Sequence, residues 1–231
     1  MIVAIDGPAG AGKSSLARRL AASLQFDFLD TGAMYRAITL ACLRRGVDMR
    51  DAAAIERCAA ESEIELQGDC VHLDGADISD QIRLPSVSKA IGPIADHPAV
   101  RERLIAMQRQ IVSGRDFVTE GRDQGTVAFP EAECKIFLTA SPQERAMRRQ
   151  KQLAAAGVER SIESILSDQD RRDAEDVNRE HGGLRAAPDS VYVLTDGLGE
   201  DEVLDRLIEI VNGRRRGLKP TKLSATKPAP R

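Results

Sequence analysis

Tryptophan is absent from this sequence, and aromatic residues of all kinds make up only 3% of its 231 residues. Single-stranded nucleic acids are commonly bound by aromatic side chains on which the bases stack, so a surface of that kind is not expected here. Charge of one sign is lacking too, because 33 Lys and Arg residues against 36 Asp and Glu residues give a net charge of -3. A chain so balanced has no general attraction to nucleic acid or anionic lipid. We therefore expect neither nucleic acid nor a membrane among its partners.

Cysteines and long apolar runs are also scarce. The four cysteines stand far apart and form no C-x-x-C pair, which predicts reduced and mostly buried thiols; they are Cys42, Cys58, Cys70 and Cys134. The apolar run at the start, residues 2–5, is too short for a signal peptide, and no run approaches the roughly 20 residues of a membrane span. We expect a cytoplasmic protein made of one α/β domain with an insertion, or of two small domains.

Glycine is concentrated where residues 7–14 give the pattern G-x-x-x-x-G-K-S. The apolar run before this pattern is typical of a buried parallel strand. After it, Leu16, Leu20 and Leu24 follow one another at helical spacing. A glycine-rich turn with a chance lysine is the alternative, but strand, glycine loop and helix together are the context that a phosphate-binding loop requires.

The chemistry of such a loop is local. Its glycines let successive backbone N–H groups surround the phosphates, and the N-terminus of the following helix adds a positive dipole. Lys13 would supply a point charge at the β- and γ-phosphate oxygens, and the Ser14 hydroxyl would be a ligand of Mg²⁺. The predicted ATP-binding residues are Gly7, Pro8, Ala9, Gly10, Ala11, Gly12, Lys13, Ser14 and Ser15.

The rest of the chain predicts an α/β protein with one β-rich insertion. Buried strands are expected at 116–121, 134–140 and 190–197, and helices at 13–24, 31–46, 51–62, 84–98, 98–114, 141–157, from 161 onward, and 200–213. From Glu63 to Gln81, short alternating segments and Gly-Asp and Asp-Gly turns predict small antiparallel strands. The sequence from Arg214 to Arg231 is basic, rich in proline and non-periodic, which predicts a disordered tail.

The loop alone does not say where the phosphoryl group goes. A regulatory GTPase would need N-K-x-D, and no such segment occurs, nor does D-x-x-G follow at a plausible distance. Five arginines are predicted in separate loops or helix ends: Arg36, Arg101, Arg122, Arg172 and Arg179. Each alone is more typical of a solvated surface charge, but together they suit a site that neutralises two phosphate-bearing substrates.

Transfer to a phosphate needs little acid–base help because the acceptor oxygen is already ionised. Catalysis then consists of alignment and of charge neutralisation by Mg²⁺, lysine and arginine. These are the requirements of a nucleoside monophosphate kinase.

At this point the sequence resembles the bacterial cytidylate kinases. Seven segments between Ile2 and Val211 carry the resemblance, in the family's order: IDGPAGAGKSS, LDTGAMYRA, DGADISDQIR, HPAVRERL, EGRDQGTVAFP, KIFLTASPQERA and RDAEDVNR. The resemblance implies a three-layer α/β/α P-loop fold over residues 1–213, with a central parallel sheet, an inserted β-rich monophosphate-binding region at 63–95 and a short lid at 172–185. It also implies ATP-dependent phosphorylation of CMP and dCMP to CDP and dCDP with Mg²⁺, by a monomer.

Carried over by position, the resemblance places the acceptor nucleotide near Thr31, with its phosphate on Arg36 and Arg122 and its cytosine edge near Arg101 and Asp123. Cytosine N4 is a hydrogen-bond donor and suits a carboxylate, whereas uracil has an acceptor there. A salt bridge between Arg122 and Asp123 is the plainer interpretation of that pair.

In the lid, Arg172 and Arg179 would contact phosphate or base, and Asp176 the acceptor ribose. The implied catalytic residues are Lys13, Arg122, Arg172 and Arg179. A solvated charged helix end is the alternative for the lid, and a surface hairpin is the alternative for 63–95.

Three positions depart from the family pattern. Glu175 stands in place of the second lid arginine, although a shifted alignment over residues 170–173 would restore an arginine there. Gly92 stands where a serine often contacts the base, and Gln124 replaces an apolar residue. A kinase with a different small acceptor, or a nucleic-acid binder that uses the basic tail, are the remaining alternatives.

Overall fold

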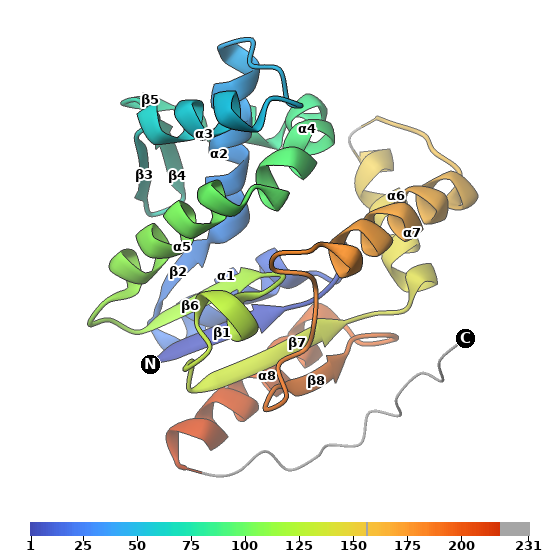
Figure 1. The fold of residues 1–231 in the computed structure, drawn as a ribbon. Helices are drawn as coiled ribbons and strands as arrows, with labels where there is room; N and C mark the ends of the chain where they lie inside the picture. Colours follow the sequence, from blue (N-terminus) through green and yellow to red (C-terminus); the bar gives the residue numbers. More distant parts are fainter. Residues whose placement is uncertain (156, 218–231) are drawn as a thin grey trace. The chain divides into compact units, whose positions relative to one another are not determined.

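The computed structural model describes residues 1–155 and 157–217, and its chain divides into two compact units (Figure 1). The first, which we name the core unit, contains Met1–Phe28 and the chain from Gly114 onward. The second, the inserted unit, is Leu29–Ser113. The insertion is therefore larger than the predicted 63–95, because the helices on both sides of that segment belong to the same unit.

A central five-stranded sheet forms the core unit and continues through β2 at the unit boundary (Figure 1). Its strands, in the spatial order β2-β6-β1-β7-β8, are β2 (Asp27–Asp30), β6 (Phe117–Gly121), β1 (Ile2–Asp6), β7 (Cys134–Thr139) and β8 (Val191–Leu194). β1 pairs in parallel with both β6 and β7, and β7 pairs in parallel with β8. The predicted α/β fold with a central parallel sheet is confirmed.

In the described part of the core unit, four α-helices are present: α1 (Lys13–Leu24), α6 (Pro142–Ala155), α7 (Ile162–Asn178) and α8 (Glu200–Arg215). Leu20 of α1 and Leu207 of α8 are fully buried in one cluster with Ile5 and Ile136 of the sheet. Each such side chain contributes about 1.5–3 kcal/mol through burial. The i, i+4, i+8 leucine spacing of α1 thus reflects the side that packs on the sheet.

The predicted tail begins too early. Helix α8 continues through Arg214 and Arg215, two residues beyond its predicted end. Positive side chains are favourable in the last turn of a helix, and the Arg215 guanidinium lies 4.5 Å from the centre of the Phe26 ring. Residues 218–231 of the predicted tail lie outside the described residues.

The inserted unit combines helices with a small antiparallel sheet. Its elements are α2 (Thr31–Arg44), α3 (Ala52–Glu61), β3 (Ile64–Gln67), β4 (Cys70–Leu73), β5 (Ala76–Asp77), η1 (Gln81–Arg83), α4 (Pro85–Asp96) and α5 (Pro98–Val112). The sheet order is β3-β4-β5 with antiparallel pairing, which confirms the strands predicted from the Gly-Asp and Asp-Gly turns. Asp30 caps α2 by accepting the Ala33 N–H at 2.9 Å.

Among the described residues, no helix is both long and apolar enough to cross a membrane. All four cysteines are free; three are buried, and Cys70 is exposed.

Candidate functional site

The glycine loop between β1 and α1 has the backbone that its sequence predicts. A Cβ atom on Gly7 would lie 1.9 Å from the Leu138 carbonyl oxygen, so no other residue fits there. Gly12 has φ +85° and forms the N-cap of α1, a conformation that glycine adopts without strain. The loop therefore brings the N-terminus of α1, with its unpaired N–H groups, to the end of β1.

Lys13 is buried at the start of α1. Its Nζ donates a hydrogen bond to the Pro8 carbonyl oxygen across the loop at 2.8 Å. Burial, and secondly the charge of Arg122, lower the pKa of Lys13 to about 7. A polyanion bound in the loop would stabilise the protonated lysine and raise that pKa again.

Ser14 has an acidic partner that the sequence did not reveal. Its Oγ donates to Glu120 Oε1 at 2.9 Å, and Glu120 is buried near the end of β6. Glu120 lies within the predicted buried strand at 116–121, where nothing in the pattern signals a role for its side chain. A hydroxyl and a carboxylate thus meet beside the loop.

Four of the predicted site residues interact with one another in the core unit: Arg122, Arg172, Asp176 and Arg179. Arg122 Nε lies 2.6 Å from Asp176 Oδ2, and Arg179 Nη2 lies 3.2 Å from Asp176 Oδ1. Burial would raise the pKa of Asp176, but Arg122 and then Arg179 hold it below its ordinary value. Desolvation by neighbouring protein atoms, followed by the charge of Arg122, lowers the pKa of the exposed Arg172. The Arg122 guanidinium thus has its ion pair with Asp176 of α7, a residue 54 positions further along the chain.

Glu175 is turned away from this cluster. It is exposed and pairs with Arg171 Nη1 at 3.1 Å, one helical turn earlier. Arg172 and Asp176 are four residues apart and therefore neighbours on the surface of α7.

The predicted lid at 172–185 is helical in its first half, because α7 continues to Asn178. One residue that the sequence analysis missed connects this helix to the phosphate loop. The buried Arg145 of α6 pairs with Asp173 of α7 at 2.6 Å and donates to the Ala9 carbonyl oxygen at 3.0 Å. Its position within an ordinary helical pattern gave no signal of these contacts.

Three predicted acceptor residues lie in the inserted unit. Arg36 Nη1 donates to Ser88 Oγ at 2.7 Å and to the Ile82 carbonyl oxygen at 3.3 Å. Arg101 is buried and donates to the Ala95 carbonyl oxygen at 3.3 Å. Thr31 is buried at the first position of α2. Arg36 and Arg101 are thus held by hydrogen bonds within their own unit.

Gly92, in the same unit, has open space around it. A Cβ atom there would meet nothing within 4 Å, so no steric demand explains the glycine.

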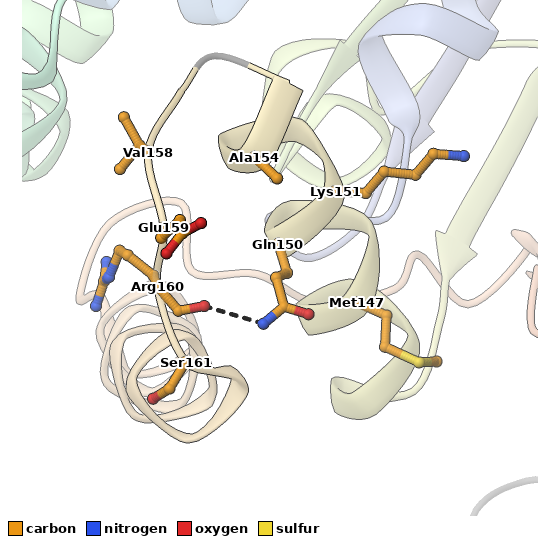
Figure 2. Close-up of a pocket in the computed structure, with 8 residues that line it drawn as sticks. All are labelled: Met147, Gln150, Lys151, Ala154, Val158, Glu159, Arg160 and Ser161. Carbon is orange, nitrogen blue, oxygen red and sulfur yellow. Dashed lines mark hydrogen bonds between the residues drawn. The ribbon is translucent and has the colours of Figure 1, made fainter.

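A separate cavity of about 550 Å³ lies between α6 and the segment that leads into α7 (Figure 2). Its lining residues are Met147, Gln150, Lys151, Ala154, Val158, Glu159, Arg160 and Ser161, and none is a predicted site residue. Gln150 Nε2 crosses it to the Arg160 carbonyl oxygen at 2.9 Å. Figure 2 shows the two chain segments joined by this bond.

Parallel sheet, glycine loop, buried lysine and adjacent arginines define an enzyme of the P-loop kinase class. The chain belongs to the cytidylate kinase family, whose family model, described as cytidylate kinase, matches residues 3–213. It is 54% identical over 211 residues to the cytidylate kinase of Rhodopirellula baltica, covering 91% of this chain and 92% of that one. It is 45% identical over 219 residues to the cytidylate kinase of Pelotomaculum thermopropionicum, covering 93% and 97%.

A solved structure of an uncharacterized protein from Eubacterium ventriosum has a TM-score of 0.51 and 12% identity, covering 92% of this chain and 98% of that one. At that identity the likeness concerns the fold alone.

Proposed function

We propose that this chain transfers the γ-phosphoryl group of ATP to CMP and dCMP, forming CDP and dCDP. The family supports this activity. The main support from the geometry is that Arg122, Asp176 and Arg179 form an ion-pair cluster, and the charge of Arg122 lowers the pKa of Lys13 in the loop. A phosphate-bearing acceptor and the donor γ-phosphate would meet there.

In the reaction an oxygen of the acceptor phosphate forms a bond to the γ-phosphorus, and the bond from that phosphorus to the β–γ bridging oxygen breaks to leave ADP. Lys13, Arg122, Arg172 and Arg179 would neutralise the charge spread over the transferring group. Asp176 pairs with two of these guanidinium groups, so the protein itself sets their positions.

Ser14 and Glu120 fit Mg²⁺, because both present hard oxygen ligands at hydrogen-bond distance from each other. Within residues 1–155 and 157–217, no group of three or more His, Cys, Asp or Glu side chains could hold a metal ion. Mg²⁺ commonly keeps several waters and binds through one or two protein ligands together with substrate phosphates, so two are sufficient. Once bound there, Mg²⁺ would neutralise charge on the β- and γ-phosphates.

On the acceptor side we assign Thr31, Arg36 and Arg101 to the nucleotide and its phosphate, and Asp123 to the cytosine amino group. A carboxylate is the natural acceptor for that amino group and repels the carbonyl that uracil presents. We further propose that the enzyme acts as a monomer in the cytoplasm with small nucleotides as its only partners.

The test is ADP release from ATP and Mg²⁺ with CMP, dCMP, UMP or AMP as acceptor. We expect CMP and dCMP to be the best substrates and expect little ADP without an acceptor or without Mg²⁺. Faster turnover of UMP or AMP than of CMP would overturn both the acceptor and the role of Asp123.

A further inference from the structure

Asp6 lies beside the start of two segments: the glycine loop at residues 7–14, which we name the donor segment, and residues 121–125 after β6, which we name the acceptor segment. It is the last residue of β1, directly before the glycine loop, and it is buried with only 3% of its surface exposed. In the parallel sheet it lies opposite Gly121 of β6, the residue before Arg122. Ligands bind at this edge of parallel sheets, beyond the carboxyl ends of the strands.

The two carboxylate oxygens of Asp6 are both used by the acceptor segment. Oδ1 accepts the backbone N–H of Gln124 and Oδ2 accepts that of Gly125, each at 2.8 Å. These two amides begin the π-helical turn η2 (Gln124–Ala128), so Asp6 caps that turn from a strand 118 residues earlier in the chain. A charged group that accepts two N–H bonds holds them more strongly than a neutral one.

Gln124, which the sequence left without an explanation, supplies a second attachment. Its Oε1 accepts the Thr119 hydroxyl at 2.8 Å, and both side chains are buried. The side chain lies against Gly121, where a Cβ atom would be only 2.8 Å from Gln124 Cγ. The turn is therefore fixed at its backbone by Asp6 and at its side chain by Thr119.

We propose that Asp6 is a positioning residue for the acceptor monophosphate, acting through the backbone that carries Arg122 and Asp123. The inference rests on the proposed function, which assigns the acceptor phosphate to Arg122 and the base to Asp123. Because Asp6 is joined directly to Gly7, one carboxylate sets the acceptor segment against the loop that holds ATP. Asp6 itself contacts neither substrate.

Asp6→Asn tests this role with little change of shape. The asparagine oxygen keeps one N–H bond, but its NH₂ group faces the other N–H and loses it. We expect KM for CMP to rise about 10- to 100-fold, because misplacing a binding group by about 1 Å can cost about a hundredfold. KM for MgATP should change by less than about threefold, and the preference for CMP over UMP should fall.

Asp196→Asn is the matched control. Asp196 also caps a backbone amide of the core unit, accepting the Ser141 N–H at 2.8 Å, but it does not touch the acceptor segment. Thr119→Val removes the second attachment and replaces Asp6→Asn if that variant does not fold. It should raise KM for CMP in the same direction by a smaller factor, again without an equal rise for MgATP.

An equal rise of both KM values, or a loss of thermal stability with both KM values unchanged, would overturn the positioning role. Either result would leave the proposed function intact, provided the wild-type enzyme still favours CMP. If the wild-type enzyme instead favours another monophosphate, the proposed acceptor fails, and the same KM comparison with that monophosphate still decides the role of Asp6.

Discussion

Asp123 follows Arg122 in the turn after β6, so the residue assigned to the base is the direct neighbour of the residue assigned to the phosphate. Its side chain is buried, and its backbone carbonyl accepts the N–H groups of Val127 at 2.8 Å and Ala128 at 3.1 Å. A carboxylate in a backbone fixed in this way has little freedom to adapt to a different base edge.

We predict that Asp123→Asn lowers the preference for CMP over UMP by about 5- to 150-fold, the equivalent of the roughly 1–3 kcal/mol that a good base contact is worth. The amide can donate to the uracil carbonyl, which the carboxylate cannot. Measured kcat/KM values for the two acceptors decide this. An unchanged ratio would remove Asp123 from base recognition.

Arg122→Ala is the comparison for that experiment. The lost guanidinium is the one that we assign to the acceptor phosphate rather than to the base, so turnover of every monophosphate should fall by about the same factor. A selective loss of CMP turnover would contradict the division of roles between the two neighbours.

The burial of Asp6 gives the protein a specific pH dependence. Burial raises the pKa of Asp6 from 3.8 to about 6, against the opposing effect of its two backbone hydrogen bonds. The raised pKa means that the folded state holds this proton more tightly than the unfolded state. The proton on Asp6 thus stabilises the folded state by about 3 kcal/mol. This stabilisation is fully present below pH 4 and is lost as the pH rises through 6.

We predict that the difference in unfolding free energy between wild type and Asp6→Asn changes over that pH range, since asparagine does not titrate. Urea unfolding at pH 4, 5, 6 and 7 measures it. The wild type should lose stability relative to the variant as the pH rises. A constant difference would show that Asp6 does not hold a raised pKa.

Helix α7 carries two sets of charges. Asp176 belongs to the ion-pair cluster and Arg172 interacts electrostatically with Arg122 and Asp176, whereas the exposed Arg171 and Glu175 pair with each other. Exposed pairs of this kind contribute little, about 0.3–0.5 kcal/mol.

We predict that Glu175→Arg changes kcat for CMP by less than about threefold, because the exposed face contributes so little. Arg172→Ala, which removes the guanidinium assigned to the transferring group, should lower kcat much further. Steady-state rates at saturating ATP and CMP give the comparison. A large gain in kcat from Glu175→Arg would mean that this position reaches the transferring phosphoryl group during turnover.

The sequence predicted elements well where their information is local. Strands β1, β6, β7 and β8 each contain a short apolar run with buried residues, and the glycine loop and helix α1 follow a pattern that few other structures satisfy. Strand β2 was missed, since its four residues DFLD begin and end with aspartate. The turn η2 was missed because its first amides are capped by a residue distant in the chain.

The site residues likewise divide into those that local motifs predict and those that depend on long-range contacts. The loop residues and the arginines follow from motifs, and the structure brings Arg122, Arg172, Asp176 and Arg179 together. Glu120, Asp6 and Arg145 were missed because each acts through a contact with a segment far along the chain. Tertiary contacts of this kind leave no periodic signal in a single sequence.

For the molecule as a whole, every predicted site residue precedes Asn212, while the basic segment follows it. We predict that a chain ending at Gly217 retains the kcat and KM values for CMP and MgATP within about twofold. The basic tail carries too few positive charges to alter the electrostatic field of the rest of the enzyme. A nucleic-acid binder using that tail would instead lose its function and show steep salt dependence. Turnover of the two chains at low and high salt separates these outcomes.

The place where the inserted unit leaves and rejoins the sheet also has an evolutionary consequence. The boundary between the two units falls within β2, between Phe28 and Leu29, and the core unit resumes at Gly114, ahead of β6. The inserted unit is therefore one continuous stretch of chain. Residues 29–113 can be exchanged as a cassette between homologous enzymes, and the phosphate loop and strands β6, β1, β7 and β8 then keep their own sequence and order. Chimaeras joined at these two junctions are a direct route to kinases that keep this donor site and accept a new monophosphate.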